Sequence, residues 1–283
     1  MSNIKPATTY DEQVERLRKR GCIVSDEQSC KEKLATINYY RLAAYFLPFK
    51  NADDTYIKGT TFEDIYGIYE FDRKIRNILF GALEAVEVSL KANFAYYHAH
   101  HYGPLGYMNA MNFNSRHDDK KFNDSIQREI ENNKRIPFVK HHLIKYNGDF
   151  PIWVITELFT FGMLSYFYND LKAADQKNIA RQLGLNYKDM ISLLRCCTDL
   201  RNICAHYGRL YFRVFSAVPA GLNLKKNEER SLWGAVLAVR ALYPSAEKWN
   251  LEIMPKFEAV FNEYTVNLSH IAFPVDWQKR LRK

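Results

Sequence analysis

The longest uninterrupted pattern in this sequence runs over residues 61–102 and repeats its apolar side chains every three or four positions. This spacing is that of one face of an α-helix, because 3.6 residues complete a turn. The apolar stripe consists of Ile68, Phe71, Ile75, Ile78, Leu79, Leu83, Val86 and Leu90. The glycine- and proline-containing residues 103–106 end it. Strand-like alternation is scarce elsewhere, so we expect an all-α fold.

The same periodicity predicts shorter helices along the rest of the chain. They cover residues 10–20, 29–49, 151–171, 175–183, 187–207, 228–242, 243–249 and 255–261. Residues 109–133 are polar and poor in branched apolar side chains, so we expect a surface excursion there. We expect the basic residues at the C-terminus to form a flexible tail with salt-sensitive affinity for RNA. They are Lys279, Arg280, Arg282 and Lys283.

The composition limits the cellular setting and the kinds of partner. A net charge of +8 indicates an anionic partner, for which RNA, DNA and an anionic membrane surface would each serve. Five cysteines without a C-x-x-C pair predict neither a disulfide framework nor a zinc site and fit a reducing cytoplasm. The N-terminus lacks the apolar core of a signal peptide. The apolar residues 150–169 include Glu157 and Gly162, so we expect a buried core helix instead of a membrane span.

Residues 193–213, LLRCCTDLRNICAHYGRLYFR, hold the side chains best suited to phosphodiester chemistry. Arg201, Asn202 and His206 fall within six positions. An imidazole titrates near neutral pH, whereas a guanidinium keeps its charge. On a helix over residues 187–207 one polar stripe would contain Lys188, Ser192, Arg195, Asp199, Asn202 and His206, opposite an apolar side that should be core.

Arg201 does not lie on that stripe. It projects about 140° away from His206 on an ideal helix, at the edge of the apolar face. An unpaired buried charge is very costly, so this guanidinium needs a partner. Two alternatives remain open. In one, Arg201 is structural and pairs with a core carboxylate, such as Glu157, Glu84 or Glu87. In the other, its side chain curls into a cleft that it shares with His206, between two helices or two protomers.

Three further clusters give weaker signals. The first cluster comprises His98, His100 and His101. Three histidines could indicate a metal site, but this spacing does not put all three imidazoles on one side of a helix. Polar positions at a frayed helix end are the simpler interpretation. The second cluster comprises Arg73, Lys74 and Arg76. A solvated helix face explains these cations about as well as a row of phosphate-binding residues does. The third cluster comprises Tyr39, Tyr40 and Arg41. These side chains could stack on RNA bases, although so dense an aromatic run more often belongs to a protein core.

The spacing R-N-x-x-x-H resembles the signature of the HEPN ribonuclease superfamily, an Arg and a His separated by four to six residues. Further segments resemble the Abi family of bacterial abortive-infection proteins, the Abi-D/Abi-F group. They are INYYRLAAYFLPF, YEFDRKIRNILFGALEAVEVSLK, FPIWVITELFTFGMLS and, most specifically, RNICAHYGRLYFR. The resemblance extends over residues 8–215. We expect residues 216–283 to form a C-terminal helical extension packed on the same core.

This resemblance implies a HEPN-like helical bundle with additional N- and C-terminal helices, and a role in phage defence, often as the toxin of a toxin–antitoxin arrangement. HEPN ribonucleases usually act as dimers without a metal or other cofactor, and the Arg and His of both protomers meet in one cleft. Carried onto this chain, Arg201 and His206 would be catalytic, with Asn202 in the polar position that commonly follows the arginine. Some Abi-F-like proteins associate with a small structured RNA that holds them inactive, so RNA is the expected partner.

The residue types fit cleavage of RNA. Neutral His206 would accept the proton of a ribose 2′-OH, which attacks the adjacent phosphate, and a second His206 would protonate the departing 5′-oxygen. Arg201 would offset the charge on the phosphorane. The product would be a 2′,3′-cyclic phosphate, and DNA would be inert because it lacks the 2′-OH.

The cations around the motif and one aromatic residue are expected to contact RNA. They are Arg195, Arg209, Arg213 and Tyr211. The alternative function is a non-catalytic RNA-binding or protein-interaction module. In that module Arg201 is a structural ion pair and His206 only completes a polar face.

Overall fold

The computed structural model describes residues 6–283, and every regular element in that range is helical. Only isolated bridges occur there, such as the one between Ile23 and Thr61, and no sheet forms. The all-α prediction is confirmed. The α-helices are α1 (Tyr10–Lys19), α2 (Glu27–Thr36), α3 (Tyr39–Phe46), α4 (Phe62–Tyr102), α5 (Asp119–Asn132), α6 (Pro137–Lys145), α7 (Ile152–Ile155), α8 (Phe161–Asp170), α9 (Ala173–Gln182), α10 (Tyr187–Ala205), α11 (Leu232–Leu242), α12 (Ala246–Lys248), α13 (Met254–Glu263) and α14 (Trp277–Leu281).

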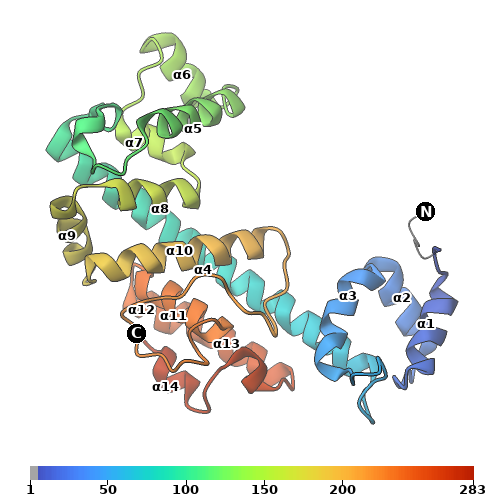
Figure 1. The fold of residues 1–283 in the computed structure, drawn as a ribbon. Helices are drawn as coiled ribbons and strands as arrows, with labels where there is room; N and C mark the ends of the chain where they lie inside the picture. The colour runs from blue at the N-terminus through green and yellow to red at the C-terminus, as the bar shows by residue number, and fades with distance from the viewer. Residues whose placement is uncertain (1–5) are drawn as a thin grey trace.

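Helix α4 is the axis of the molecule and has 41 residues (Figure 1). A capping box begins it, because the Thr61 hydroxyl accepts from the Asp64 N–H while the Asp64 carboxylate accepts from the Thr61 N–H. Gly103 ends it with a φ of 79°, a left-handed conformation that favours glycine. The sequence pattern therefore predicts the longest helix almost to the residue.

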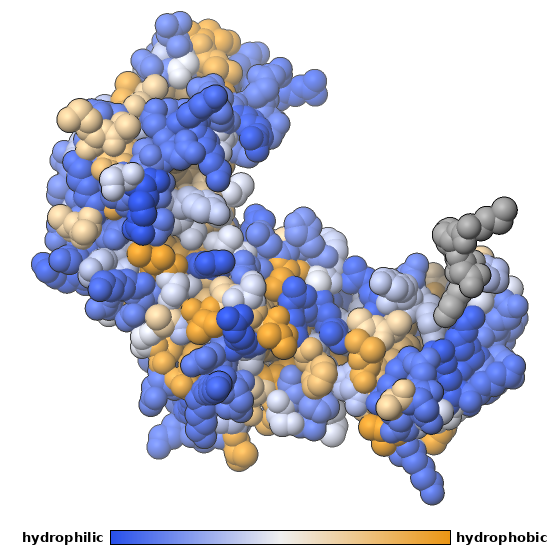
Figure 2. Space-filling model, in the orientation of Figure 1, coloured by the Kyte–Doolittle hydropathy of each residue, from blue (hydrophilic) through white to orange (hydrophobic). Residues whose placement is uncertain are grey.

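The other helices group along α4 (Figure 1). Helices α1 to α3 gather at its N-terminal end and α5 to α7 at its C-terminal end, while α10, α11 and α13 pack against it between them. Their buried apolar side chains form one continuous core. The outline is a crescent whose hollow side is lined mainly by hydrophilic residues (Figure 2). Within residues 6–283 no helix combines the length and the apolarity needed to cross a membrane.

Two predicted helices are interrupted by local hydrogen bonds. The segment 151–171 is one helix in the prediction, but α7 passes into a 3₁₀ turn and α8 starts afresh, because the Thr160 hydroxyl accepts from the Met163 N–H at 3.2 Å. The segment 29–49 breaks at Asn38, whose side chain accepts from the Tyr40 N–H at 2.8 Å and starts α3. Side-chain caps of this kind compete with helix continuation.

Two predicted irregular segments are ordered. Residues 109–133 contain α5, which buries Ile126 and Ile130 on one face. The basic C-terminus is not a flexible tail, because α14 packs on α13 and Arg280 forms an ion pair with Glu228 at 2.9 Å. Its backbone is fixed as well, since the Lys283 N–H donates to the Asn250 side chain at 2.9 Å.

Candidate functional site at the end of helix α10

Helix α10 ends in a Schellman motif that places the motif histidine. His206 is the C-cap, and the N–H groups of Tyr207 and Gly208 reach back to the carbonyls of Cys204 (3.1 Å) and Ile203 (2.7 Å). Tyr207 occupies the left-handed position with a φ of 56°, where glycine is usual. A Cβ on Gly208 would lie 2.9 Å from Ile203 Cγ2, so the close return of the chain requires glycine there. The imidazole of His206 therefore lies on a sharply turned helix end.

A buried polar cluster holds the chain that follows this turn. The carboxylate of Asp72, which is 0% exposed, accepts from the N–H groups of Leu210 (3.1 Å) and Tyr211 (2.7 Å) and from the Tyr45 hydroxyl (2.7 Å). It also forms an ion pair with Arg76, which is 4% exposed. We call these five residues the Asp72 cluster. It fixes the loop after the motif to helix α4.

This cluster corrects the prediction of a solvated face or phosphate track for Arg76, whereas Arg73 and Lys74 remain at the surface, as the solvated-face interpretation expects. Arg76 is buried, Arg73 pairs with Glu70, and Lys74 pairs with Glu263 at 2.6 Å. The sequence does carry a signal for the buried pair. Asp72 and Arg76 are four residues apart and each directly follows a residue of the apolar stripe, and charged side chains at a buried edge of a helix need a partner at such a spacing.

Arg201 leans toward α4, whereas Asn202 and His206 are exposed to solvent. Arg201 Nε lies 4.0 Å from Glu87 Oε2, and the arginine side chain is 33% exposed. Glu87 has a closer cationic partner in Lys91, at 3.2 Å. In the described part of the chain the side chains of Asn202 and His206 form no hydrogen bond. We call Arg201, Asn202 and His206 the motif face.

Two of the four predicted RNA-binding side chains lie on the surface. Arg195 is exposed and lines a cavity of about 400 Å³ between α8 and α10. Arg213 is also exposed, and its guanidinium donates to the carbonyl of Arg209 at 3.4 Å. Both remain available to phosphate groups.

The other two are bound within the protein. The Arg209 guanidinium donates to the carbonyl of Ala44, and burial holds the pKa of Arg209 below its usual range. Tyr211 is only 1% exposed, and its hydroxyl lies 2.8 Å from Nδ1 of His270. The assignment of Tyr211 to an RNA-binding surface is therefore corrected, because the Asp72 cluster draws this residue into the core.

A cavity of about 490 Å³ borders the C-terminal end of α10. Its lining residues are Arg41, Tyr69, Arg73, Arg76, Asn77, Phe80, Cys204, Ala205 and Tyr207. Arg41 donates to the carbonyl of Tyr207 at 2.7 Å, which joins α3 to the end of the motif helix. The ring of Tyr207 is 68% exposed beside His206. The sequence analysis did not identify Tyr207 as an exposed ring next to the motif histidine. The available signal is an aromatic residue directly before a glycine at a helix end.

Burial limits the chemistry of His98 in the predicted histidine cluster and of the five cysteines. His98 is 0% exposed and packs against the rings of Tyr102 and Phe113, which corrects its prediction as a polar helix-end residue. Within residues 6–283 no three His, Cys, Asp or Glu side chains are grouped to hold a metal ion. All five cysteines are buried, and burial raises the pKa of Cys196 and of Cys204 to about 12. These thiols stay protonated at neutral pH and are poor nucleophiles.

Comparison with known proteins places the chain in a family. The sequence model of the family described as Abi-like protein matches residues 32–212, a range that begins in α2 and includes α4, α10 and the whole R-N-x-x-x-H motif. Searches of curated proteins and of solved structures find no match. The match covers more than half of the chain, and it indicates a role in abortive infection, a defence against phage. The chain belongs to the Abi-like protein family.

Proposed function

We propose that this protein is a metal-independent endoribonuclease that acts in phage defence and uses the motif face as its catalytic group. The observation that carries the proposal is the contrast at the end of α10. His206 is exposed and free of hydrogen-bond partners in the described chain, while the segment directly after it is fixed by the Asp72 cluster. A general base must be reachable by the substrate, and His206 is exposed on a helix end whose following loop is anchored to α4.

The roles of the three residues follow from their chemistry. Neutral His206 takes the proton of a ribose 2′-OH, and the resulting alkoxide attacks the adjacent phosphorus. A protonated imidazole gives its proton to the departing 5′-oxygen, which leaves a 2′,3′-cyclic phosphate. Arg201 offsets the charge of the phosphorane, and Asn202 donates a hydrogen bond to a phosphate oxygen. One positioned acid–base group supplies about 10²–10⁴-fold of the rate.

Arg201 and His206 point in different directions from one helix, so a second copy of the chain would complete the site. In a homodimer the arginine of one protomer and the histidine of its partner would meet at one phosphate. A structured RNA bound over the motif face would block the same residues and hold the enzyme inactive. In this proposal the protein acts in the cytoplasm, where it would meet both phage RNA and host RNA as substrates.

The second candidate is a non-catalytic RNA-binding module in which Arg201 is structural. The contact between Arg201 and Glu87 favours it. That contact is weak, because its 4.0 Å distance lies beyond hydrogen-bonding range and the arginine side chain is one-third exposed. A structural ion pair in a core would be closer and buried, as Asp72 and Arg76 are.

The test is the chemistry of the product ends. Purified protein is incubated with labelled RNA in EDTA, beside the same RNA carrying 2′-deoxyribose at the cleaved position. We expect cleavage in EDTA, 2′,3′-cyclic phosphate ends and no cleavage of the deoxy-substituted linkage. His206→Ala, purified identically, controls for contaminating nucleases and should not cleave. Cleavage that stops in EDTA, or that persists in His206→Ala, contradicts the proposal.

A further inference from the structure

Two neighbouring cavities flank an exposed aromatic ring on α8. Tyr166 is 67% exposed, although its neighbours Phe167 and Tyr168 are buried. A cavity of about 270 Å³ lies on the α5 side and one of about 400 Å³ on the α10 side, and both are lined by Tyr166 and Asn169. The two cavities therefore border the tyrosine on two sides, and we call the pair of them, with the tyrosine between, the groove.

Each half of this groove contains cations without an acidic partner. Arg195 lines the α10 half, and Arg116 and Lys121 line the α5 half. Lys121 Nζ lies 5.7 Å from the centre of the Tyr166 ring, within range of a cation–π contact. Among residues 6–283 none of these three cations forms an ion pair.

The acidic side chains of the groove are bound within the protein. Asp118 accepts from the Lys121 N–H at 3.0 Å, and Asp199 accepts from the Ser216 hydroxyl at 2.6 Å. Asp170 Oδ2 lies 3.1 Å from Nδ1 of His117. These carboxylates keep their negative charge, and the formal charges of the lining residues balance. The difference is one of partners, because each carboxylate already has a donor within the protein, whereas none of the three cations has an acidic partner within residues 6–283.

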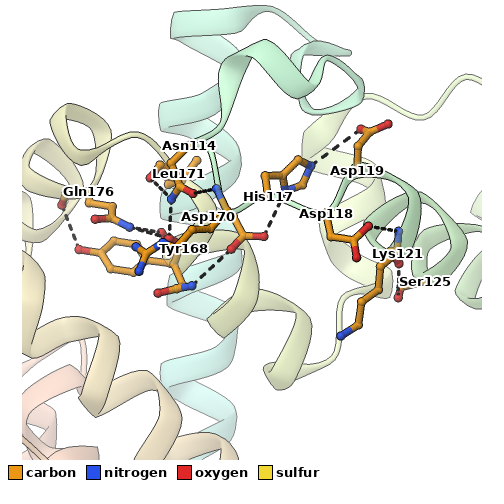
Figure 3. A network of polar contacts seen from close by, with 12 residues as sticks. Asn114, His117, Asp118, Asp119, Lys121, Ser125, Tyr168, Asp170, Leu171 and Gln176 are labelled. Atoms are coloured by element: carbon orange, nitrogen blue, oxygen red, sulfur yellow. Dashed lines mark hydrogen bonds and ion pairs between the residues drawn. The ribbon is translucent and has the colours of Figure 1, made fainter.

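A network of polar contacts fixes the α5 side of the groove (Figure 3). His117, whose side chain is 2% exposed, lies between Asp170 and Asp119, with Nε2 3.8 Å from Asp119 Oδ1. Asn114 donates to the carbonyls of Asn169 (2.9 Å) and Leu171 (3.1 Å). The loop before α5 is thus joined to the end of α8, and the groove is formed before any ligand binds.

The groove leads toward the motif face. Arg195 precedes Asn202 by seven and His206 by eleven residues of the same helix, which are rises of about 10 and 16 Å along its axis. Multiples near 3.6 residues put all three on one side of α10. A few nucleotides of an extended strand cover this distance.

We propose that Tyr166 is a stacking platform for a base of single-stranded RNA, with the flanking phosphates bound by Arg195 on one side and by Arg116 and Lys121 on the other. A paired strand does not offer a free base face, so the groove selects unpaired RNA. The proposal rests on the proposed function, because it supplies the path by which the substrate reaches His206.

The test measures binding of a fluorescent unstructured RNA to variants in a His206→Ala background, which keeps the RNA intact. Tyr166→Ala should raise Kd about tenfold, the size typical of a lost base–aromatic stack. Tyr166→Phe should bind like the parent, because the aromatic face remains. Arg195→Gln should reduce the dependence of binding on salt, since it removes one phosphate contact. Tyr96→Ala is the matched control, because Tyr96 is also 67% exposed but lies on α4 outside the groove.

The platform is overturned if Tyr166→Ala binds like the parent, if Tyr96→Ala weakens binding equally, or if the parent does not bind single-stranded RNA. A duplex of the same sequence should show no effect of Tyr166→Ala, and an equal effect there also overturns it. Cleavage of the same RNA by the wild-type protein is recorded separately. Loss of binding in Tyr166→Ala together with an inactive wild type would leave the platform standing and refute the nuclease.

Discussion

The Asp72 cluster and the motif face are joined by one short loop, yet their polar side chains differ in burial and in the number of partners. In the cluster, Asp72 and Arg76 are almost fully buried, and the carboxylate is satisfied by donors from three segments of the chain. On the motif face, His206 and Asn202 are exposed, and Arg201 has only a distant carboxylate. Polar groups that hold a fold are surrounded by partners, whereas Asn202 and His206 keep their side-chain donors and acceptors free within the described chain.

The comparison predicts its largest stability effect at Asp72. Asp72→Asn leaves the Arg76 charge buried without a counter-ion, which should lower the free energy of unfolding by about 3–5 kcal/mol. Urea unfolding followed by circular dichroism measures this change. Glu70→Gln is the control, because it breaks the more exposed pair with Arg73 on the same helix and should cost no more than about 1 kcal/mol. An equal loss of unfolding free energy in both variants would contradict the claim that the buried pair contributes more than the exposed pair.

A buried imidazole provides the next largest effect. Burial lowers the pKa of His98 from 6.5 to about 4. The unfolded chain therefore binds more protons than the folded one between these values, so stability falls as pH drops from about 6.5 toward 4. The full loss is about 3 kcal/mol, since one pKa unit corresponds to about 1.4 kcal/mol.

Unfolding free energies at pH 7 and pH 4.5 test this prediction. His98→Leu should remove much of the wild-type acid sensitivity. His100→Gln should retain it, because His100 is exposed on the same helix. An unchanged pH dependence in His98→Leu would show that another group titrates in this window.

The turn between the two regions gives an intermediate effect. Gly208→Ala puts a Cβ 2.9 Å from Ile203 Cγ2 and should lower stability by about 1–3 kcal/mol. Gly81→Ala, at a helical position with open space around it, should instead add about 0.5–1 kcal/mol. Thermal unfolding of both variants compares the signs directly. A Gly208→Ala protein as stable as the wild type would mean that the helix end is not tightly packed.

The smallest stability effect belongs to the motif face. His206→Gln should change the free energy of unfolding by no more than about 0.5 kcal/mol, because the side chain is exposed and has no partner in the described chain. The same urea titration measures it. A loss above about 1 kcal/mol would place His206 among the residues that hold the fold.

Local sequence patterns predict much of this molecule. The extents of α4 and α10, to within two residues, and the polar stripe that contains Arg195, Asn202 and His206 follow from helical periodicity and from local stop signals such as residues 103–106, because both act within one segment. The caps at Asn38 and Thr160 are harder to predict, since a short side chain decides whether a helix continues.

What the sequence does not predict depends on contacts between distant segments. Asp72 binds the backbone of Leu210, 138 residues later, and that contact buries Tyr211, an apparent surface residue in the motif. The sequence does not predict the proposed platform at Tyr166 either, because its two flanking cavities require α5 and α10 to lie on either side of α8. Neither arrangement leaves a periodic signal along the chain.

The central claim is that Arg201 acts on RNA and does not hold the fold, and a paired measurement on Arg201→Ala and Glu87→Gln tests it most directly. RNA cleavage and unfolding free energy are measured on the same preparations. Arg201→Ala should reduce cleavage at least about 100-fold and change stability by less than about 1 kcal/mol. Glu87→Gln should cleave like the wild type. Normal cleavage by Arg201→Ala, or a parallel loss of stability and cleavage in both variants, would contradict the account.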